Sequence, residues 1–322
     1  MWKYLKDERG NILVFATLAM VAMIGFAALS IDVGTMLAAR NQLQAAADAG
    51  ALSGATGLLT NQTLATTRAI ATVGRNLCIR QPISITAADV TFPQADRIQV
   101  QTHQVVTLNF AGVLGISSTN VTAVAVAELG TCPGAKGLKP WAIPDLYDEG
   151  DTHVLIKSGQ IGAAGTNPGY FYPVDFPPLD AGYGAPETGA QEYLDNILHG
   201  SDQTISPNMM LQVEPGNMIG PTQQGVNELI NQDPGAYWDG TEVVDAEGNP
   251  NSDSPRIVII PMYYPDEVPD SGRNYVTVHR LGVFFLEGFS GQSLYGTFMT
   301  TISPEQSYSG GNSMLKGVRL VQ

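Results

Sequence analysis

An uninterrupted apolar stretch near the N-terminus dominates the hydropathy pattern of the chain. Asn11 to Ile31 comprises 21 residues without a charge or a proline. At 1.5 Å per residue, a helix of that length crosses a hydrocarbon core of about 30 Å. Three basic residues precede the stretch and the next one after it is Arg40, so the positive-inside bias predicts a cytoplasmic N-terminus at 1–10. We therefore predict a single transmembrane helix at 11–31, with the rest of the chain outside the cytoplasm.

Other interpretations of this stretch make different demands on the sequence. A cleaved secretory signal has an apolar region of roughly 7 to 15 residues before a small-residue cleavage site. "FAALS" (residues 26–30) offers such a site, but the apolar run is longer than a signal requires. A buried core helix of this length would carry charges on one face. A retained anchor fits best, and a processed pilin-type N-terminus stays open.

The pattern after Ile31 changes to that of an amphipathic helix. Asp32, Arg40 and Asp48 recur at eight-residue intervals among strong helix formers, so one helix of about 45 residues can leave the membrane and enter a folded domain. Small residues at four-residue spacing let another backbone approach closely. That partner is either the next helix of the chain, at 64–77, or another membrane helix. The predicted helix-packing residues are Ala46, Ala47, Gly50, Ala51 and Gly54.

Alternating polarity follows between Arg97 and Phe110. Such a period of two predicts a strand with one buried face, and His103 falls on the polar face. The apolar members are Ile98, Val100, Val106, Leu108 and Phe110. A long helix packed on a small antiparallel sheet makes the domain at 32–131 α+β.

Charge and proline are divided unevenly along the chain. Residues 1–139 carry 10 Lys and Arg against 7 Asp and Glu, whereas residues 140–322 carry 6 against 23. The second part also holds 17 of the 20 prolines, which disfavour helix interiors and central strands. We therefore predict a second domain at 132–322 that is acidic, mostly β and rich in loops. Its strand-like segments are 153–158, 256–264, 274–289 and 294–302, and its helices are Ala190–His199 and Thr222–Asn231.

Segments flanking the apolar stretch resemble a known family. Glu8-Arg9-Gly10, Asp32-Val33-Gly34 and the run from Gln42 to Ala51 are similar to the N-terminal region of TadE/TadG-like Flp (tight-adherence) pilus-assembly proteins. Val105 to Leu129 is similar to the strand, turn and strand that follow in such proteins. "CPGAKGLKPWAIPD", "EPGNMIGPTQQGVNELI" and "LKGVRLVQ" resemble a TadG-related subgroup. The resemblance implies a single-pass bacterial inner-membrane protein with a pilin-like α+β domain and a periplasmic C-terminal part.

Two departures limit what the resemblance implies. In the prepilin-like TadE branch a peptidase cuts after a Gly and a Glu follows five positions later, whereas Gly10 is followed at that position by Phe15. The missing carboxylate is the group that can neutralise a neighbouring N-terminal amine inside an apolar bundle. Longer TadG proteins can carry a von Willebrand A domain with an Asp-x-Ser-x-Ser metal loop, which the nearest segment, "NSDSP" (251–255), does not match.

Cys78 and Cys132 are the only cysteines. Outside the cytoplasm an oxidising compartment favours a disulfide between them, which would close a loop of about 55 residues and contribute roughly 4 kcal/mol. The alternative is two unrelated buried thiols. No Cys-x-x-Cys is present, which removes support for zinc-ribbon and thioredoxin-like chemistry.

Two common motifs of enzymes and nucleotide-binding sites are missing from the sequence. It contains no Gly-x-Ser-x-Gly elbow and no phosphate loop ending in Gly-Lys-Ser/Thr. One acidic segment places oxygen side chains at alternate positions, as calcium loops do, although Pro250 and Arg256 stand where such loops need Gly and Glu. A metal-free hairpin loop has the same composition. The candidate ligands are Asp245, Glu247, Asn249, Asn251 and Asp253.

These patterns predict a non-enzymatic, cofactor-free accessory protein of tight-adherence pilus assembly, anchored in the inner membrane. Its partners would be other pilus-assembly proteins, with self-association through the N-terminal helix as a further possibility. The acidic surface repels phosphate backbones, so nucleic acid is not expected as a partner. The alternatives are a membrane-tethered module that binds cations or glycans, a minor pilin-like filament subunit, and a hydrolase with an unrecognised carboxylate pair.

Overall fold

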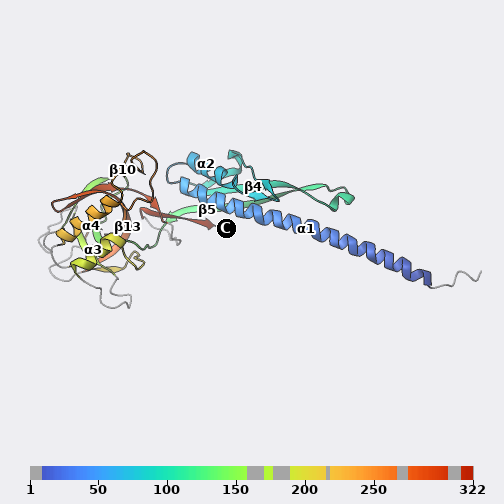
Figure 1. Ribbon diagram of the computed structural model, residues 1–322, viewed down its shortest axis with the longest axis horizontal. Helices are drawn as coiled ribbons and strands as arrows, with labels where there is room; N and C mark the ends of the chain where they lie inside the picture. Colours follow the sequence, from blue (N-terminus) through green and yellow to red (C-terminus); the bar gives the residue numbers. More distant parts are fainter. Residues whose placement is uncertain are drawn as a thin grey trace, which may run out of the picture. The chain divides into compact units, whose positions relative to one another are not determined.

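The computed structural model describes residues 9–157, 170–176, 189–214, 218–266, 275–303 and 313–321. The chain divides into two compact units: unit 1 is Met1–Glu128 with Leu320–Gln322, and unit 2 is Leu129–Arg319. Each unit combines helices with strands, and a long apolar helix begins the chain (Figure 1). The predicted α+β class is therefore confirmed.

Helix α1 (Arg9–Gly57) runs for 49 residues without interruption, close to the length predicted from the sequence. Its high content of Ala and other helix formers, and the lack of proline, favour this continuity. After a short turn, α2 (Gln62–Val73) begins at Asn61, whose side-chain oxygen accepts a 2.8 Å hydrogen bond from the backbone N–H of Leu64. This N-cap satisfies one of the amide groups left without partners at a helix start.

Two of the strands in unit 1 form a long antiparallel hairpin. Strand β4 (Arg97–Thr107) pairs with β5 (Ser118–Thr131) from Arg97 opposite Glu128 to Thr107 opposite Ser118. A salt bridge of 2.7 Å joins Arg97 to Glu128 where the pairing begins. The remaining strands of unit 1 up to β5 are β1 (Leu77–Cys78), β2 (Gln81–Pro82) and β3 (Val90–Gln94), with β3 antiparallel to β4.

The predicted alternation along β4 is confirmed for Ile98, Val100, Val106 and Leu108, all of which are buried. It is wrong for Phe110, whose side chain is 41% exposed. Strand β4 ends at Thr107, and the chain then turns through a 3-10 helix, η2 (Ala111–Leu114), so the period of two no longer applies. Gly115 closes this turn with φ of 85°, a backbone conformation that favours glycine.

Unit 2 contains a mixed sheet with two helices packed against each other. Among the described residues its strand order is β12-β6-β8-β7-β14-β13-β9, and β12 also pairs with β13, so six of the strands close into a ring. Helix α3 (Ala190–His199) has the bounds predicted from the sequence, and α4 (Ile219–Gln232) extends the predicted segment at both ends. The strands of the sheet are β6 (Trp141–Pro144), β7 (Thr152–Lys157), β8 (Tyr170–Asp175), β9 (Met210–Val213), β12 (Ile257–Tyr263), β13 (Tyr275–Ser290) and β14 (Ser293–Phe298).

The core of unit 2 explains why its apolar runs form strands. Residues such as Trp141, Phe171 and Phe284 are fully buried in one cluster that the sheet and helices share. A two-stranded sheet of β10 (Tyr237–Trp238) and β11 (Val243–Val244) lies outside this sheet, and β15 (Thr301–Ile302) pairs in parallel with β16 (Leu315–Val321). The sequence interpretation of a mostly β second half therefore agrees with the described strands.

Candidate functional site

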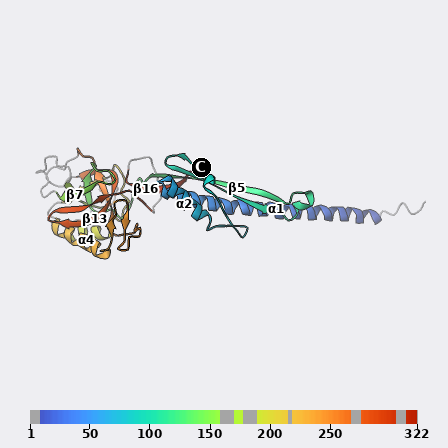
Figure 2. The same cartoon turned by 90° about the horizontal axis from the view of Figure 1, so that it is seen from above.

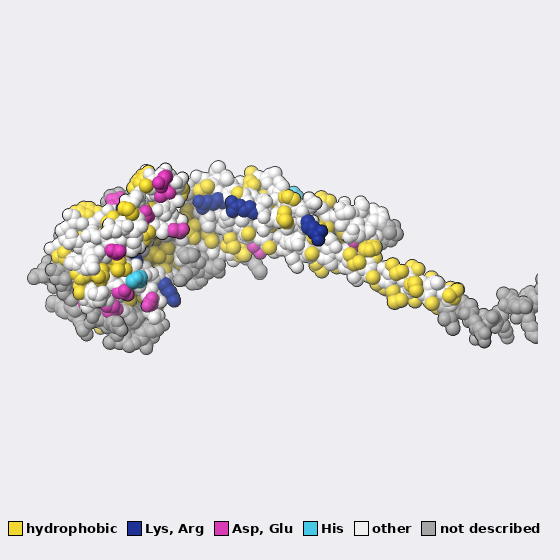
Figure 3. Space-filling model, viewed as in Figure 1, with side chains coloured by type: hydrophobic (Ala, Val, Ile, Leu, Met, Phe, Trp, Pro, Cys, Tyr) yellow, Lys and Arg dark blue, Asp and Glu magenta, His cyan; other side chains and the backbone are white. Residues whose placement is uncertain are grey.

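The N-terminal half of α1 is an exposed apolar surface. Phe15 is 68% exposed and Phe26 is 71% exposed, and the helix extends beyond the rest of unit 1 (Figures 1 and 2). In Figure 3 hydrophobic side chains cover the visible face of this segment. The large exposed residues, which define the apolar helix surface, are Leu13, Val14, Phe15, Leu18, Met20, Val21, Met23, Ile24, Phe26, Leu29, Ile31, Val33 and Leu37.

Polar groups within this surface are satisfied by the helix itself. Thr17, Ser30 and Thr35 each donate a side-chain hydrogen bond of 2.8–2.9 Å to a backbone carbonyl one turn earlier. A membrane interior demands that polar groups find partners within the segment. Among the described residues, α1 is the one helix long and apolar enough to cross a membrane, and its apolar stretch is exposed, unlike that of a core helix.

Asp32, the first charged residue after the apolar stretch, attaches α1 to the β4–β5 hairpin. Its carboxylate accepts backbone hydrogen bonds from Asn109 at 2.7 Å, Phe110 at 3.0 Å and Ala111 at 2.6 Å. The side chain is buried at 2% exposure. Three amide donors replace the water molecules that would solvate an exposed carboxylate. Their hydrogen bonds offset the free-energy cost of burying it. Sequence reasoning noted Asp32 as a charge at the end of the span but missed this role.

Strand β4 runs antiparallel to α1, as three contacts show. A Cβ built on Gly54 would lie 2.5 Å from Ile98 Cδ1. The Thr102 hydroxyl donates a 3.0 Å hydrogen bond to the carbonyl of Leu43. The Asp32 bonds to residues 109–111 lie still nearer the N-terminus of the helix. The turn at the end of the hairpin is therefore held beside the C-terminal end of the apolar stretch.

The predicted helix-packing residues all lie in the interior of unit 1. Ala46, Ala47 and Ala51 have no exposed surface, and a Cβ on Gly50 would lie 2.5 Å from Val73 Cγ2 in α2. Their small size therefore allows α1 to approach α2 and β4 of its own chain. The alternative of contact with a separate membrane helix would have to use the exposed half of α1, where these residues do not lie.

The predicted disulfide is not present in the structure, where Cys78 and Cys132 are not joined and both are buried. The Cys78 thiol donates a 3.7 Å hydrogen bond to the carbonyl of Ala39 in α1, and burial raises its pKa. Cys132 belongs to the core of unit 2, where its backbone N–H bonds the carbonyl of Leu315. Each cysteine is thus packed into the core of a different unit, and the sequence spacing did not reveal this.

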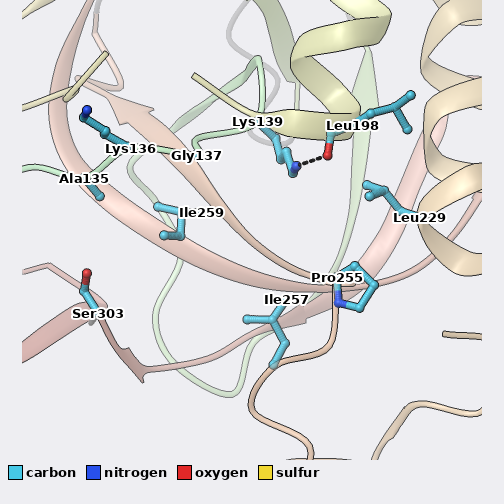
Figure 4. Close-up of a pocket in the computed structure, with 10 residues that line it drawn as sticks. All are labelled: Ala135, Lys136, Gly137, Lys139, Leu198, Leu229, Pro255, Ile257, Ile259 and Ser303. Atoms are coloured by element: carbon cyan, nitrogen blue, oxygen red, sulfur yellow. Dashed lines mark hydrogen bonds between the residues drawn. The ribbon is translucent and has the colours of Figure 1, made fainter. Parts of the chain in front are cut away.

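A cavity of about 300 Å³ in unit 2 contains one buried amine. Lys139 Nζ donates a 3.0 Å hydrogen bond to the carbonyl of Leu198 near the end of α3, as Figure 4 shows. Burial lowers the pKa of Lys139 to about 8. Lys136 also lines the cavity but extends away from Lys139. Apolar side chains form most of the cavity wall. The amine therefore bonds a carbonyl at the end of α3, where backbone carbonyls lack partners within the helix.

A buried polar cluster lies under α3 and α4. Tyr193 Oη is 3.0 Å from both Trp141 Nε1 and Thr222 Oγ1, and burial raises the pKa of Tyr193. Glu214 and Asp175, on neighbouring chain segments, are buried carboxylates at 4% and 3% exposure. These side chains are enclosed within the described part of unit 2.

The candidate calcium loop folds on itself. Asp245 accepts backbone hydrogen bonds from Asn249 at 2.8 Å and Glu247 at 3.0 Å, and the bond from Asn249 is the main reason that its pKa is lowered. The amide of Asn251 turns away to Asp233 Oδ2. These contacts are those of an Asx-type turn. Within the part of the chain that the structure describes, no three His, Cys, Asp or Glu residues are grouped so that they could hold a metal ion.

An ion-pair cluster connects the end of β6 to β13 in unit 2. Arg280 Nε donates a 2.5 Å hydrogen bond to Asp145, which His279 Nδ1 also contacts. Arg280 Nη2 bonds the carbonyl of Tyr147 at 2.7 Å. The histidine ring packs against Tyr264 with centroids 4.2 Å apart. The arrangement holds a loop to a strand, and the spacing of the histidines in the sequence did not indicate it.

Comparison with known proteins matches one part of the chain. Residues 10–57, which are α1 without its first residue, match the TadE/G-like Flp pilus-assembly family. No curated protein and no solved structure matches the chain. The matched segment contains both the apolar helix surface and the small residues that pack against α2 and β4.

Proposed function

We propose that this protein is a single-pass, membrane-anchored accessory protein of tight-adherence pilus assembly that acts by protein–protein contact and not by catalysis. The match of residues 10–57 to the pilus-assembly family supports this role. The observation that carries the proposal is that the same segment presents an exposed apolar helix surface. A surface of this kind is unfavourable in water and is stable within a bilayer.

The two units of the chain would have different roles. The basic residues that precede the apolar stretch favour a cytoplasmic N-terminus, with both folded units in the periplasm. The small α+β unit would hold the anchor rigidly. Residues 140–322 carry 23 Asp and Glu against 6 Lys and Arg, so they favour a partner with a basic surface among the other assembly proteins. Acidic side chains are visible over unit 2 in Figure 3.

Deletion of the gene provides the test. Loss of pili and of surface adhesion is expected, with recovery when the full chain is supplied again. Wild-type piliation in the deletion strain would overturn the proposal. Replacement of residues 11–31 by an unrelated membrane span separates two roles of the helix. Piliation should be retained if the helix only anchors the protein, and lost if the helix recognises a specific partner.

A minor filament subunit is the second candidate, because the family match begins at Gly10, where a prepilin peptidase would cut. Phe15 occupies the position at which a processed pilin has Glu. N-terminal sequencing of the protein purified from membranes separates the two roles. An intact N-terminus is expected for the anchored accessory protein, whereas a chain that begins at Asn11 and co-purifies with filaments would favour the subunit.

A further inference from the structure

The end of the β4–β5 hairpin is unusually apolar for an exposed turn. Residues 104–127 contain no Asp, Glu, Lys or Arg, and the turn itself reads "FAGVLGI" (110–116). Phe110 is 41% exposed and Ile116 is 54% exposed. Exposed turns in water are usually built from polar residues, Gly and Pro. We call residues 110–116 the hairpin turn.

The position of the hairpin turn along α1 is fixed by Asp32. Its carboxylate binds the backbone N–H groups of residues 109–111, and it directly follows the apolar stretch that ends at Ile31. The two views of the chain agree that the hairpin ends beside α1 and that the helix continues past it (Figures 1 and 2). A bilayer that surrounds residues 11–31 would therefore begin at the level of this turn.

Four backbone N–H groups of the turn are hydrogen-bonded. Gly115 donates a 3.0 Å hydrogen bond to the carbonyl of Gly112, and Ile116 donates one of 3.1 Å to Ala111. Asp32 accepts the amides at the start of the turn. Unpaired backbone groups make irregular structure unfavourable in a lipid environment, and these bonds reduce that cost.

We propose that the hairpin turn is a second membrane contact, which places Phe110 and Ile116 at the boundary between the headgroups and the acyl chains of the bilayer that α1 crosses. The inference rests on the proposed membrane anchoring of α1. Aromatic side chains favour this boundary, and the turn has no charge that would oppose entry. Asp32, which binds the turn, is flanked in α1 by the exposed apolar residues Ile31 and Val33, so lipid is favoured over a separate protein as the occupant.

The test uses the full chain in phosphatidylcholine vesicles with an environment-sensitive NBD fluorophore on one introduced cysteine. The variants are Ile116→Cys for the turn, Leu18→Cys for the middle of the helix, and Val105→Cys as a control. Val105 is an apolar strand residue that is 64% exposed but lies further from the turn. Labelled wild type measures the background from the buried native cysteines.

Doxyl-labelled lipids should quench the fluorophore at positions 18 and 116, with emission shifted to shorter wavelength, but not at position 105. Quenching at 18 with a water-like signal at 116 would overturn the hairpin contact and leave the anchor intact. A water-like signal at 18 would overturn both. Equal quenching at 116 and 105 would show general attachment to lipid and would also contradict a specific turn contact.

A matched pair of substitutions tests the chemistry. Phe110→Asp in the Ile116→Cys protein should abolish the quenching and the emission shift, because a carboxylate resists entry into the bilayer. Val105→Asp in the same background should leave both unchanged. Circular dichroism verifies that each variant keeps its helix and strand content. Retained quenching in a folded Phe110→Asp protein would contradict the proposal.

Discussion

The carboxylate of Asp32 accepts a 2.6 Å hydrogen bond from the backbone N–H of Ala111, a residue 79 positions further along the chain. Together with the bonds from Asn109 and Phe110, it connects the end of the apolar stretch to the end of the hairpin. The carboxylate is buried, and the three bonds it accepts are partly shielded from solvent. The stability of the hairpin end is thereby coupled to a single position in α1.

Asp32→Ala is expected to loosen the hairpin end. Removal of the carboxylate takes the acceptor away from three partly buried backbone amides, which is unfavourable. Hydrogen–deuterium exchange of residues 109–111 should accelerate, and the melting temperature should fall. Asp32→Asn should show a smaller change, because one amide oxygen can still accept. Thr35→Val serves as the control, since the Thr35 hydroxyl bonds only its own helix. Unchanged exchange in Asp32→Ala would show that these bonds do not stabilise the turn.

Gly57→Ala should destabilise unit 1 although Ala is the better helix former. A Cβ at Gly57 would lie 2.5 Å from Ala65 N and 2.6 Å from Ala65 Cα, which are backbone atoms that cannot swing aside. Overpacking of this kind costs about 1–3 kcal/mol. Gly34→Ala is the matched control, because nothing lies within 4 Å of the added atom. Thermal denaturation in detergent should show a lower transition for Gly57→Ala and an equal or higher one for Gly34→Ala. The reverse order would exclude close backbone packing at Gly57.

Lys139 should make the stability of unit 2 depend on pH. Its pKa is about 8 in the folded protein, below the ordinary value of 10.5, so the unfolded chain binds more protons between these values. The free energy of unfolding therefore rises with pH in this window, by roughly 1 kcal/mol per pH unit, and is independent of this group below it. Buried tyrosines such as Tyr193 have raised pKa values and oppose the trend at higher pH.

Lys139→Met removes the titrating group, so urea denaturation between pH 8 and 10 should show a flatter dependence than in the wild type. Lys136→Met is the matched control, because that side chain is exposed and extends away from the Lys139 amine. It should keep the wild-type slope. The same slope in Lys139→Met as in the wild type would mean that the amine remains protonated and hydrated in the cavity.

Cys78 should behave as a protected thiol. Its side chain is buried against Ala39 and its pKa is raised, and both features slow the reaction with alkylating reagents. Without reductant, alkylation should be slow in the folded protein and should modify both cysteines in denaturant. A peptide that links Cys78 to Cys132 in non-reducing mass mapping would contradict the structure and restore the disulfide expected from the compartment.

Local patterns in the sequence were sufficient to predict several elements. The apolar periodicity and Gly200 set the bounds of α3, and the absence of helix breakers predicted the length of α1. Alternation predicted the buried face of β4 up to Leu108. Each of these signals depends on residues close together in the sequence, so the local sequence is sufficient to predict the element.

Other features depend on tertiary contacts between residues that lie far apart in the sequence, which local sequence patterns do not reveal. Phe110 follows the alternation of β4 but is exposed, because the strand ends before it and Asp32 binds the turn. The burial of the two cysteines in different cores could not be predicted from their spacing. The same holds for Lys139, whose sequence context shows neither the end of α3 nor the cavity around the amine.

The unbroken course of α1 has a mechanical consequence. At 1.5 Å per residue, its 49 residues measure roughly 74 Å, and the helix has no proline at which it would kink. The C-terminal half is clamped between α2 and β4, while the N-terminal half carries the apolar surface. A force applied to unit 1 would therefore tilt the membrane-spanning part of α1 as one rigid body. A flexible linker would instead extend and would not transmit the same force.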